Sequence, residues 1–135
     1  MGKLDLTPIS IEELATVLGS DERARQYATM TRSLMSNIGI DNIDGPIRSK
    51  LLRETLETKL AEALFNGFGI TSPTPSKPHP LIHKIAQQAS AAKTLNVRTA
   101  WLHTAFVQAR RLYDEAEIAR GYVDTSDQLR AEMGL

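Results

Sequence analysis

The sequence contains no cysteine, and its positive and negative charges balance. With Cys 0 in 135 residues, disulfide bonds, thiolate metal sites and cysteine nucleophiles are excluded. Lys+Arg 16 against Asp+Glu 16 gives a formal net charge of +0, so the chain as a whole lacks the basic character typical of nucleic-acid-binding domains. A local basic patch is still compatible with this balance.

Long apolar runs are absent as well. No run approaches the ~20 apolar residues that a membrane-spanning helix needs. The opening residues, MGKLDLTPIS, contain neither the apolar core nor the cleavage site of a signal peptide. We therefore expect an intracellular soluble protein, either cytoplasmic or a virion component, with no membrane partner. Its length suits one domain with a core of its own.

No stretch alternates in the way that predicts a strand, whereas helical spacing recurs along the chain. The longest helical stretch is 46–68, PIRSKLLRETLETKLAEALFNGF, which the Gly45-Pro46 pair predicts to start at Pro46. One face carries leucines four residues apart, and a second carries other apolar residues: Ile47, Leu51, Ala61, Phe65 and Phe68. We predict an all-α bundle of five to six helices around a central helix 46–68.

Two shorter helices precede this stretch. Ser10 and Glu13 have the spacing of a capping box, which predicts a helix from there to about Leu18. Ser20 is the predicted cap of a second helix, and Gly39 is its predicted end.

Residues 69–80, GITSPTPSKPHP, are rich in proline and predict an extended connector. The connector separates an N-terminal helical core, 1–68, from a C-terminal helical segment, 81–135, and together they form one domain or one oligomerising unit. Its length favours delivery of the later helices to a neighbouring chain.

The C-terminal segment contains two long helical stretches, 81–93 and 97–120. If they formed one straight rod, their apolar stripes would lie about 160° apart, so we predict a break at 94–96 with Thr94 or Asn96 as the new cap. Thr125 and Gln128 repeat the capping-box spacing and predict a last short helix.

No set of residues predicts a catalytic, cofactor or metal site. His79 and His83 are four residues apart, but His79 lies between prolines outside the predicted helix and no glutamate follows it as in hydrolase helices. Gly67 and Gly69 follow a helix, the reverse of the context of a phosphate-binding loop. We expect no enzymatic activity and no cofactor.

Two stretches carry a family resemblance: IEELATVLGSDERARQYATMTRSLMSNIGI (11–40) and DGPIRSKLLRETLETKLAEAL (44–64). Residues 11–64 resemble the front of tailed-phage head–tail connector proteins, the adaptors beneath the portal ring. The shared features are a short capped helix ending in Leu-Gly, a second helix with an acidic start, and a long helix beginning near a proline. The resemblance implies a ring-forming structural subunit without catalytic residues.

Two functions follow as hypotheses. The first is a structural subunit that assembles into a homo-oligomer or with other protein subunits, with a candidate interface at Phe65, Phe68, Trp101, Phe106 and Tyr113. The alternative is a small all-helical nucleic-acid-binding accessory subunit of a ribonucleoprotein or DNA-binding complex. Its candidate contacts are Lys84, Lys93, Arg98, Arg110 and Arg111.

Overall fold

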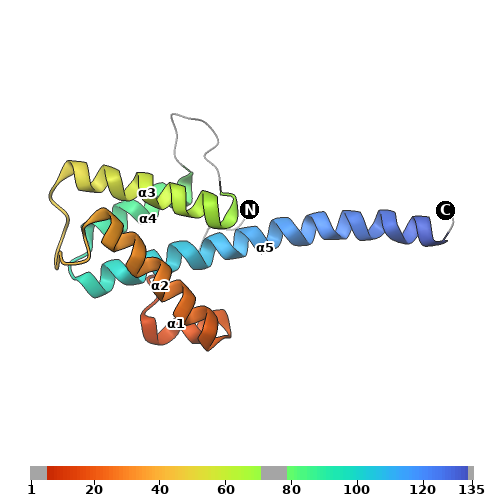
Figure 1. Ribbon diagram of the computed structural model, residues 1–135, viewed down its shortest axis with the longest axis horizontal. Helices are drawn as coiled ribbons and strands as arrows, with labels where there is room; N and C mark the ends of the chain where they lie inside the picture. The colour runs from red at the N-terminus through yellow and green to blue at the C-terminus, as the bar shows by residue number, and fades with distance from the viewer. Residues whose placement is uncertain (1–5, 71–78, 134–135) are drawn as a thin grey trace.

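The computed structural model describes residues 6–70 and 79–133, with side chains as far as Ile118. Five helices make up these ranges, and no strand occurs in them (Figure 1): α1 (Ile11–Leu18), α2 (Asp21–Ile38), α3 (Lys50–Phe68), α4 (Pro80–Ala91) and α5 (Leu95–Met133). The predicted all-α bundle is confirmed. Among the described helices, none is long and apolar enough to cross a membrane.

The first two helices have the ends that the sequence predicts. The Ser10 side chain accepts a hydrogen bond from the Glu13 N–H, and the Glu13 carboxylate accepts one from the Ser10 N–H, which completes the capping box. Gly19 ends α1 with φ 69°, and Gly39 ends α2 with φ 87°, both in the left-handed region that favours glycine. Local chemistry therefore determines this part of the chain.

The predicted start of the long helix at Pro46 is wrong. The helix α3 begins at Lys50, where the Ser49 side chain accepts a hydrogen bond from the Leu52 N–H. Ile47 lies before the helix and is buried, and its N–H donates to the Ser90 carbonyl of α4 at 2.8 Å. An extended segment can bury Ile47 and make this bond, so tertiary contact outweighs the preference of proline for a helix start.

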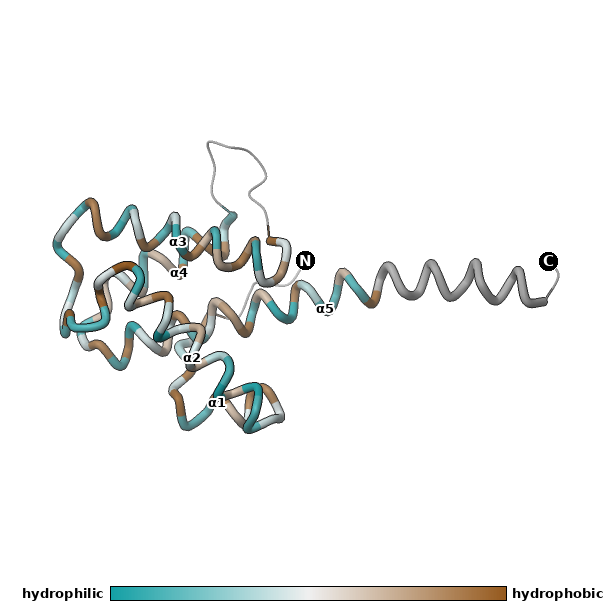
Figure 2. The backbone as a smooth tube through the Cα atoms, in the orientation of Figure 1, coloured by the Kyte–Doolittle hydropathy of each residue, from teal (hydrophilic) through white to brown (hydrophobic). Residues whose placement is uncertain are grey.

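The two apolar faces of α3 are not equally covered. Leu56, Leu60 and Leu64 are completely buried, whereas Leu51 and Phe65 are 71% and 55% exposed. Hydrophobic positions recur along the helices of the bundle in Figure 2, but only one stripe of α3 lies in the core. On the second face, Leu51 and Phe65 are therefore exposed, whereas Ala61 and Phe68 are half-buried and pack against the core.

The predicted break between the C-terminal helices is confirmed. After α4 ends, Thr94 caps α5 by accepting a hydrogen bond from the Val97 N–H, and Asp44 accepts one from the Leu95 N–H at 2.7 Å. The two helices pack against each other, so their apolar stripes can both face the core. Thr94, rather than Asn96, is the cap.

The bundle is organised around α5, not around α3 as predicted. The helix α5 contacts each of α1, α2, α3 and α4, and every residue from Leu102 to Ala109 is buried. Contact with four helices explains this complete burial.

No separate helix starts at Thr125. The helix α5 continues through this position to Met133. A capping box starts a helix only where its cap residue has a non-helical backbone conformation. Here the cap position lies inside an uninterrupted helix, so the spacing marks no helix start.

Most of the predicted connector, 71–78, lies outside the described residues. The helices on its two sides share one core, which includes Leu14, Leu56, Ile85 and Phe106. Thus α4 and the first half of α5 pack on their own chain, contrary to the expectation that they are delivered to a neighbour.

Candidate functional site

A cleft opens where α3 ends and α5 continues past it. It has a volume of about 500 Å³ and is lined by residues 65–70 of α3 and its cap, together with Leu112, Tyr113, Ala116 and Glu117 of α5. Gly69, with φ 71°, is the left-handed cap that ends α3 there. We call this the α3–α5 cleft.

Large apolar side chains are exposed around this cleft. Phe65 is 55% exposed and Tyr113 is 38% exposed, and both line it. Ile118, which is 71% exposed, does not line the cleft. Single exposed apolar residues are ordinary on protein surfaces, whereas a group of them beside a cleft is typical of a binding surface.

Phe68 joins this cleft to the core. Its ring lies 6.4 Å from that of Tyr27 and 6.4 Å from that of Phe106, centroid to centroid, and the Tyr27 and Phe106 rings are 6.5 Å apart. These distances are within the range of favourable aromatic contacts. Because Phe68 is half-buried and Phe106 is 1% exposed, the cleft has an aromatic inner side held in place by the core.

The structure brings together three of the five predicted interface residues. Phe65 and Tyr113 are exposed at the α3–α5 cleft, and Phe68 lines it from the core side. Phe106 is a core residue, so its assignment to a subunit interface is wrong. Trp101 is half-buried, packs against the core and does not line this cleft. The apolar stripe of a helix predicts burial but not which partner covers it.

Sequence analysis missed Ile70, Leu112 and Ala116 as residues of this surface. Leu112 and Ala116 belong to the predicted stripe of the later helix, but the spacing of the stripe cannot show where the bundle ends. Core packing shows it, since Leu112 is the last described residue of α5 that packs against the hydrophobic core.

Arg98 is the main correction to the predicted nucleic-acid contacts. Its side chain is completely buried, with Nε donating to the Ala89 carbonyl at 2.9 Å and Nη1 to the Ile43 carbonyl at 2.5 Å. Nη2 donates to the Gly45 carbonyl. Burial lowers the pKa of Arg98, and nearby Asp44 opposes that effect. A guanidinium used in this way is not free to bind phosphate.

The other predicted basic contacts do not line one cleft. Arg110 forms an ion pair with Asp114, with Nε 3.1 Å from Oδ1, and the hydrogen bond to this carboxylate raises the pKa of Arg110. Lys84, Lys93 and Arg111 are exposed, but none of them lines the α3–α5 cleft.

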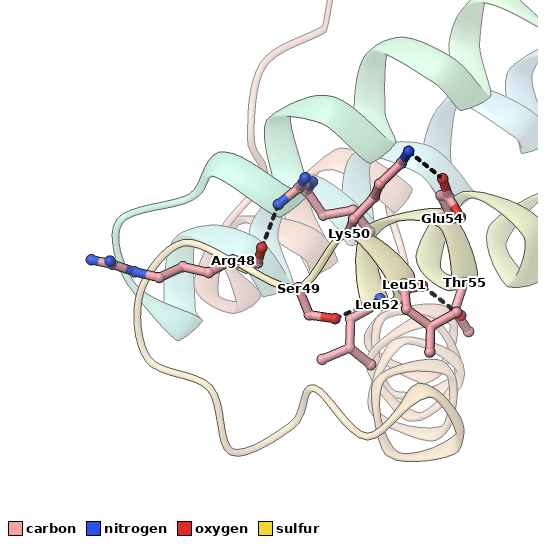
Figure 3. Close-up of polar contacts among 8 residues, drawn as sticks. Arg48, Ser49, Lys50, Leu51, Leu52, Glu54 and Thr55 are labelled. Atoms are coloured by element: carbon pink, nitrogen blue, oxygen red, sulfur yellow. Dashed lines mark hydrogen bonds and ion pairs between the residues drawn. The ribbon is translucent and has the colours of Figure 1, made fainter.

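A second cleft of about 550 Å³ lies between α3 and α4, and its charged side chains have protein partners. Figure 3 shows Lys50 beside Glu54 at the start of α3, 3.9 Å between Nζ and Oε1. Arg53 donates to the Arg48 carbonyl at 2.8 Å. His83 Nδ1 lies 3.2 Å from Glu57 Oε1. Exposed pairs of this kind contribute about 0–1 kcal/mol, and the arrangement does not provide a buried general acid or base.

His79 and His83, which have the i, i+4 spacing of metal ligands on a helix, make different contacts. His79 Nδ1 accepts a hydrogen bond from the Leu81 N–H at 3.1 Å, which caps α4, and burial lowers the pKa of His79. His83 instead contacts Glu57. Within the described part of the chain, no group of three or more histidine, cysteine, aspartate or glutamate residues could hold a metal ion.

Comparison with models of protein families, with curated proteins and with solved structures found no match to this chain. The α3–α5 cleft and its exposed apolar side chains are therefore interpreted from physical chemistry alone.

Proposed function

We propose that the chain is a non-catalytic structural subunit that assembles into a homo-oligomer or a larger protein complex through the α3–α5 cleft and the rest of α5. The observation that carries this proposal is the length of α5. It is one helix of 39 residues, yet among its described side chains the last in the hydrophobic core is Ala109, and the last that packs against the core is Leu112. Figure 1 shows it running on beyond the bundle.

A helix that leaves its own bundle needs a partner for stability. We call residues 119–133, ARGYVDTSDQLRAEM, the α5 extension. Isolated helices of about 12–15 residues are marginal in water, and Gly121 within this one costs a further ~1 kcal/mol relative to alanine. Packing against another subunit would supply the missing stabilisation.

The finer form of the proposal is a head–tail connector subunit of a tailed phage, hence a virion component. The resemblance of residues 11–64 to that family supports it, and the helix ends at Gly19 and Gly39 are among the features on which the resemblance rests. Such a subunit would form a ring, in which the same surfaces repeat around an axis.

Light scattering during size-exclusion chromatography tests the proposal. We expect the full chain to have a molar mass well above the monomer value of 14.9 kDa, and the double variant Phe65→Ser, Tyr113→Ser to shift towards monomer. Leu51→Ser is the matched control, because Leu51 is apolar and more exposed than either residue but does not line the cleft. Its association state should not change.

Two results would contradict the proposal. One is a full chain that stays monomeric up to high micromolar concentration. The other is equal loss of association in the double variant and in Leu51→Ser. Binding to a labelled oligonucleotide that weakens steeply with salt, and that is lost when Lys84, Lys93 and Arg111 are replaced by glutamine, would favour the nucleic-acid alternative instead.

A further inference from the structure

The α3–α5 cleft contains a glycine that the described part of its own chain does not need. Gly67 lies in the last turn of α3, lines the cleft and does not have a positive φ. Apart from its own turn of helix, a Cβ added there would meet no atom within 4 Å. Alanine would stabilise this helix better than glycine does. Neither the backbone conformation nor packing within the described chain therefore requires glycine at this position.

A missing side chain gives a partner room to approach the backbone. Ala116, on the α5 side of the cleft, is small as well, whereas Phe65 and Tyr113 are large, exposed and apolar. Gly67 and Ala116 thus leave space in a cleft of about 500 Å³ that is also lined by large apolar side chains. Grooves of this kind bind the apolar face of an amphipathic helix.

The α5 extension has the sequence pattern of such a helix. From Ile118, apolar residues recur at Tyr122, Leu129 and Met133, at intervals of four, seven and four residues. These intervals repeat on one face of a helix, and α5 is helical through Met133. The pattern therefore predicts an apolar stripe, whose first member, Ile118, is 71% exposed.

The stripe leads away from the cleft of its own chain. The last α5 residue that lines the cleft is Glu117, and the helix continues from there without a break to Met133. At a rise of about 1.5 Å per residue, Met133 lies roughly 24 Å farther along the axis than Glu117. Figure 1 shows α5 running away from the bundle. The cleft that receives the stripe must therefore belong to another molecule.

We propose that the occupant of the α3–α5 cleft is the α5 extension of a second copy of this chain. This contact rests on the assembly proposed above and adds which two surfaces meet, the cleft of one subunit and the apolar stripe of the next. Because the two surfaces differ, every subunit is satisfied only when the series of contacts closes. Two copies that exchange their extensions close it, and so does a ring.

The first test blocks the cleft without changing the core. Gly67→Gln puts a long uncharged side chain, with good helix propensity, into the space that the stripe would occupy. The variant should stay folded by circular dichroism, and light scattering should show that its half-dissociation concentration rises several-fold. Thr58→Gln is the matched control, because Thr58 is exposed on the same helix and does not line the cleft. Its association should not change.

The second test uses the absence of cysteine from the sequence. Asn66, which is exposed and lines the cleft, is replaced by cysteine in one tagged copy, and Thr125 in a co-expressed copy with a different tag. By sequence spacing, Thr125 belongs to the face of the stripe and Asp127 to the opposite face. A short bismaleimide should join Asn66→Cys to Thr125→Cys and give several-fold less product with Asp127→Cys.

The outcomes separate this contact from the assembly on which it rests. An associated chain in which Gly67→Gln has unchanged affinity, or in which Thr125→Cys and Asp127→Cys cross-link equally, overturns the docking of the extension and leaves the assembly standing. A full chain that stays monomeric overturns both. If Gly67→Gln does not fold, cross-linking decides.

Discussion

Arg98 is the largest side chain that the described bundle buries completely, and its hydrogen-bond acceptors are backbone carbonyls. The carbonyl of Ala89 belongs to the end of α4, while those of Ile43 and Gly45 belong to the loop between α2 and α3. One guanidinium thus joins two separate parts of the chain near the start of α5. Its planar set of donors suits several carbonyls at once, which a lysine cannot reproduce.

We predict that Arg98→Met lowers the free energy of unfolding by about 3 kcal/mol. Hydrogen bonds from a charged donor contribute about 1.5–3 kcal/mol each, and three carbonyls lose theirs, but removal of a buried charge offsets part of the loss. Urea denaturation followed by circular dichroism measures the change. Arg111→Met, at an exposed position of the same helix, should stay within about 0.5 kcal/mol. Equal effects at both positions would contradict the role given to Arg98.

At the scale of elements, side-chain caps mark where helices begin. Ser10, Ser20, Ser49 and Thr94 each accept a hydrogen bond from a backbone N–H in the first turn of the helix that follows. Ser10 and Ser20 were predicted as caps, and Thr94 was one of two candidates for the cap of α5. Ser49 was missed, and it lies three residues after the proline at which the helix was predicted to start. Pro46 and Ser49 could each start the helix. The burial of Ile47, which lies between them, determines that the helix starts after Ser49.

We predict that Ser10→Ala lowers the free energy of unfolding by about 0.5–2 kcal/mol, because it removes the Oγ that accepts from the Glu13 N–H and donates to the Glu13 carboxylate. Ser36→Ala is the control, since Ser36 is exposed inside α2 and makes no cap. Alanine has the higher helix propensity, so the control should be neutral or slightly stabilising. Chemical denaturation with unchanged slope gives both values, and a larger loss at Ser36 would contradict the assigned start of α1.

At the scale of the whole molecule, the bundle and the rest of α5 have different roles. Among the side chains that the structure describes, as far as Ile118, the hydrophobic core reaches along α5 to Ala109, and Leu112 is the last residue that packs against it. We therefore expect the bundle to fold without the α5 extension.

We predict that removal of residues 119–135 changes the free energy of unfolding of the monomeric bundle by less than about 0.5 kcal/mol, because every core residue among the described side chains is kept. The same truncation should abolish the association proposed above. Denaturation at low protein concentration measures the first effect, and light scattering measures the second. A truncated chain that unfolds would show that the α5 extension stabilises its own bundle, contrary to this division of roles.

The sequence by itself determined the all-α class, most of the helix ends and the break before α5. These features depend on residues within about four positions of each other, such as Ser10 with Glu13, or on the incompatible stripes around Asn96. Only the tertiary structure decided that α5 is the central helix, that Arg98 is buried, and that the second face of α3 stays open at Phe65. Those outcomes depend on which distant surfaces meet, and an apolar stripe specifies burial without specifying its partner.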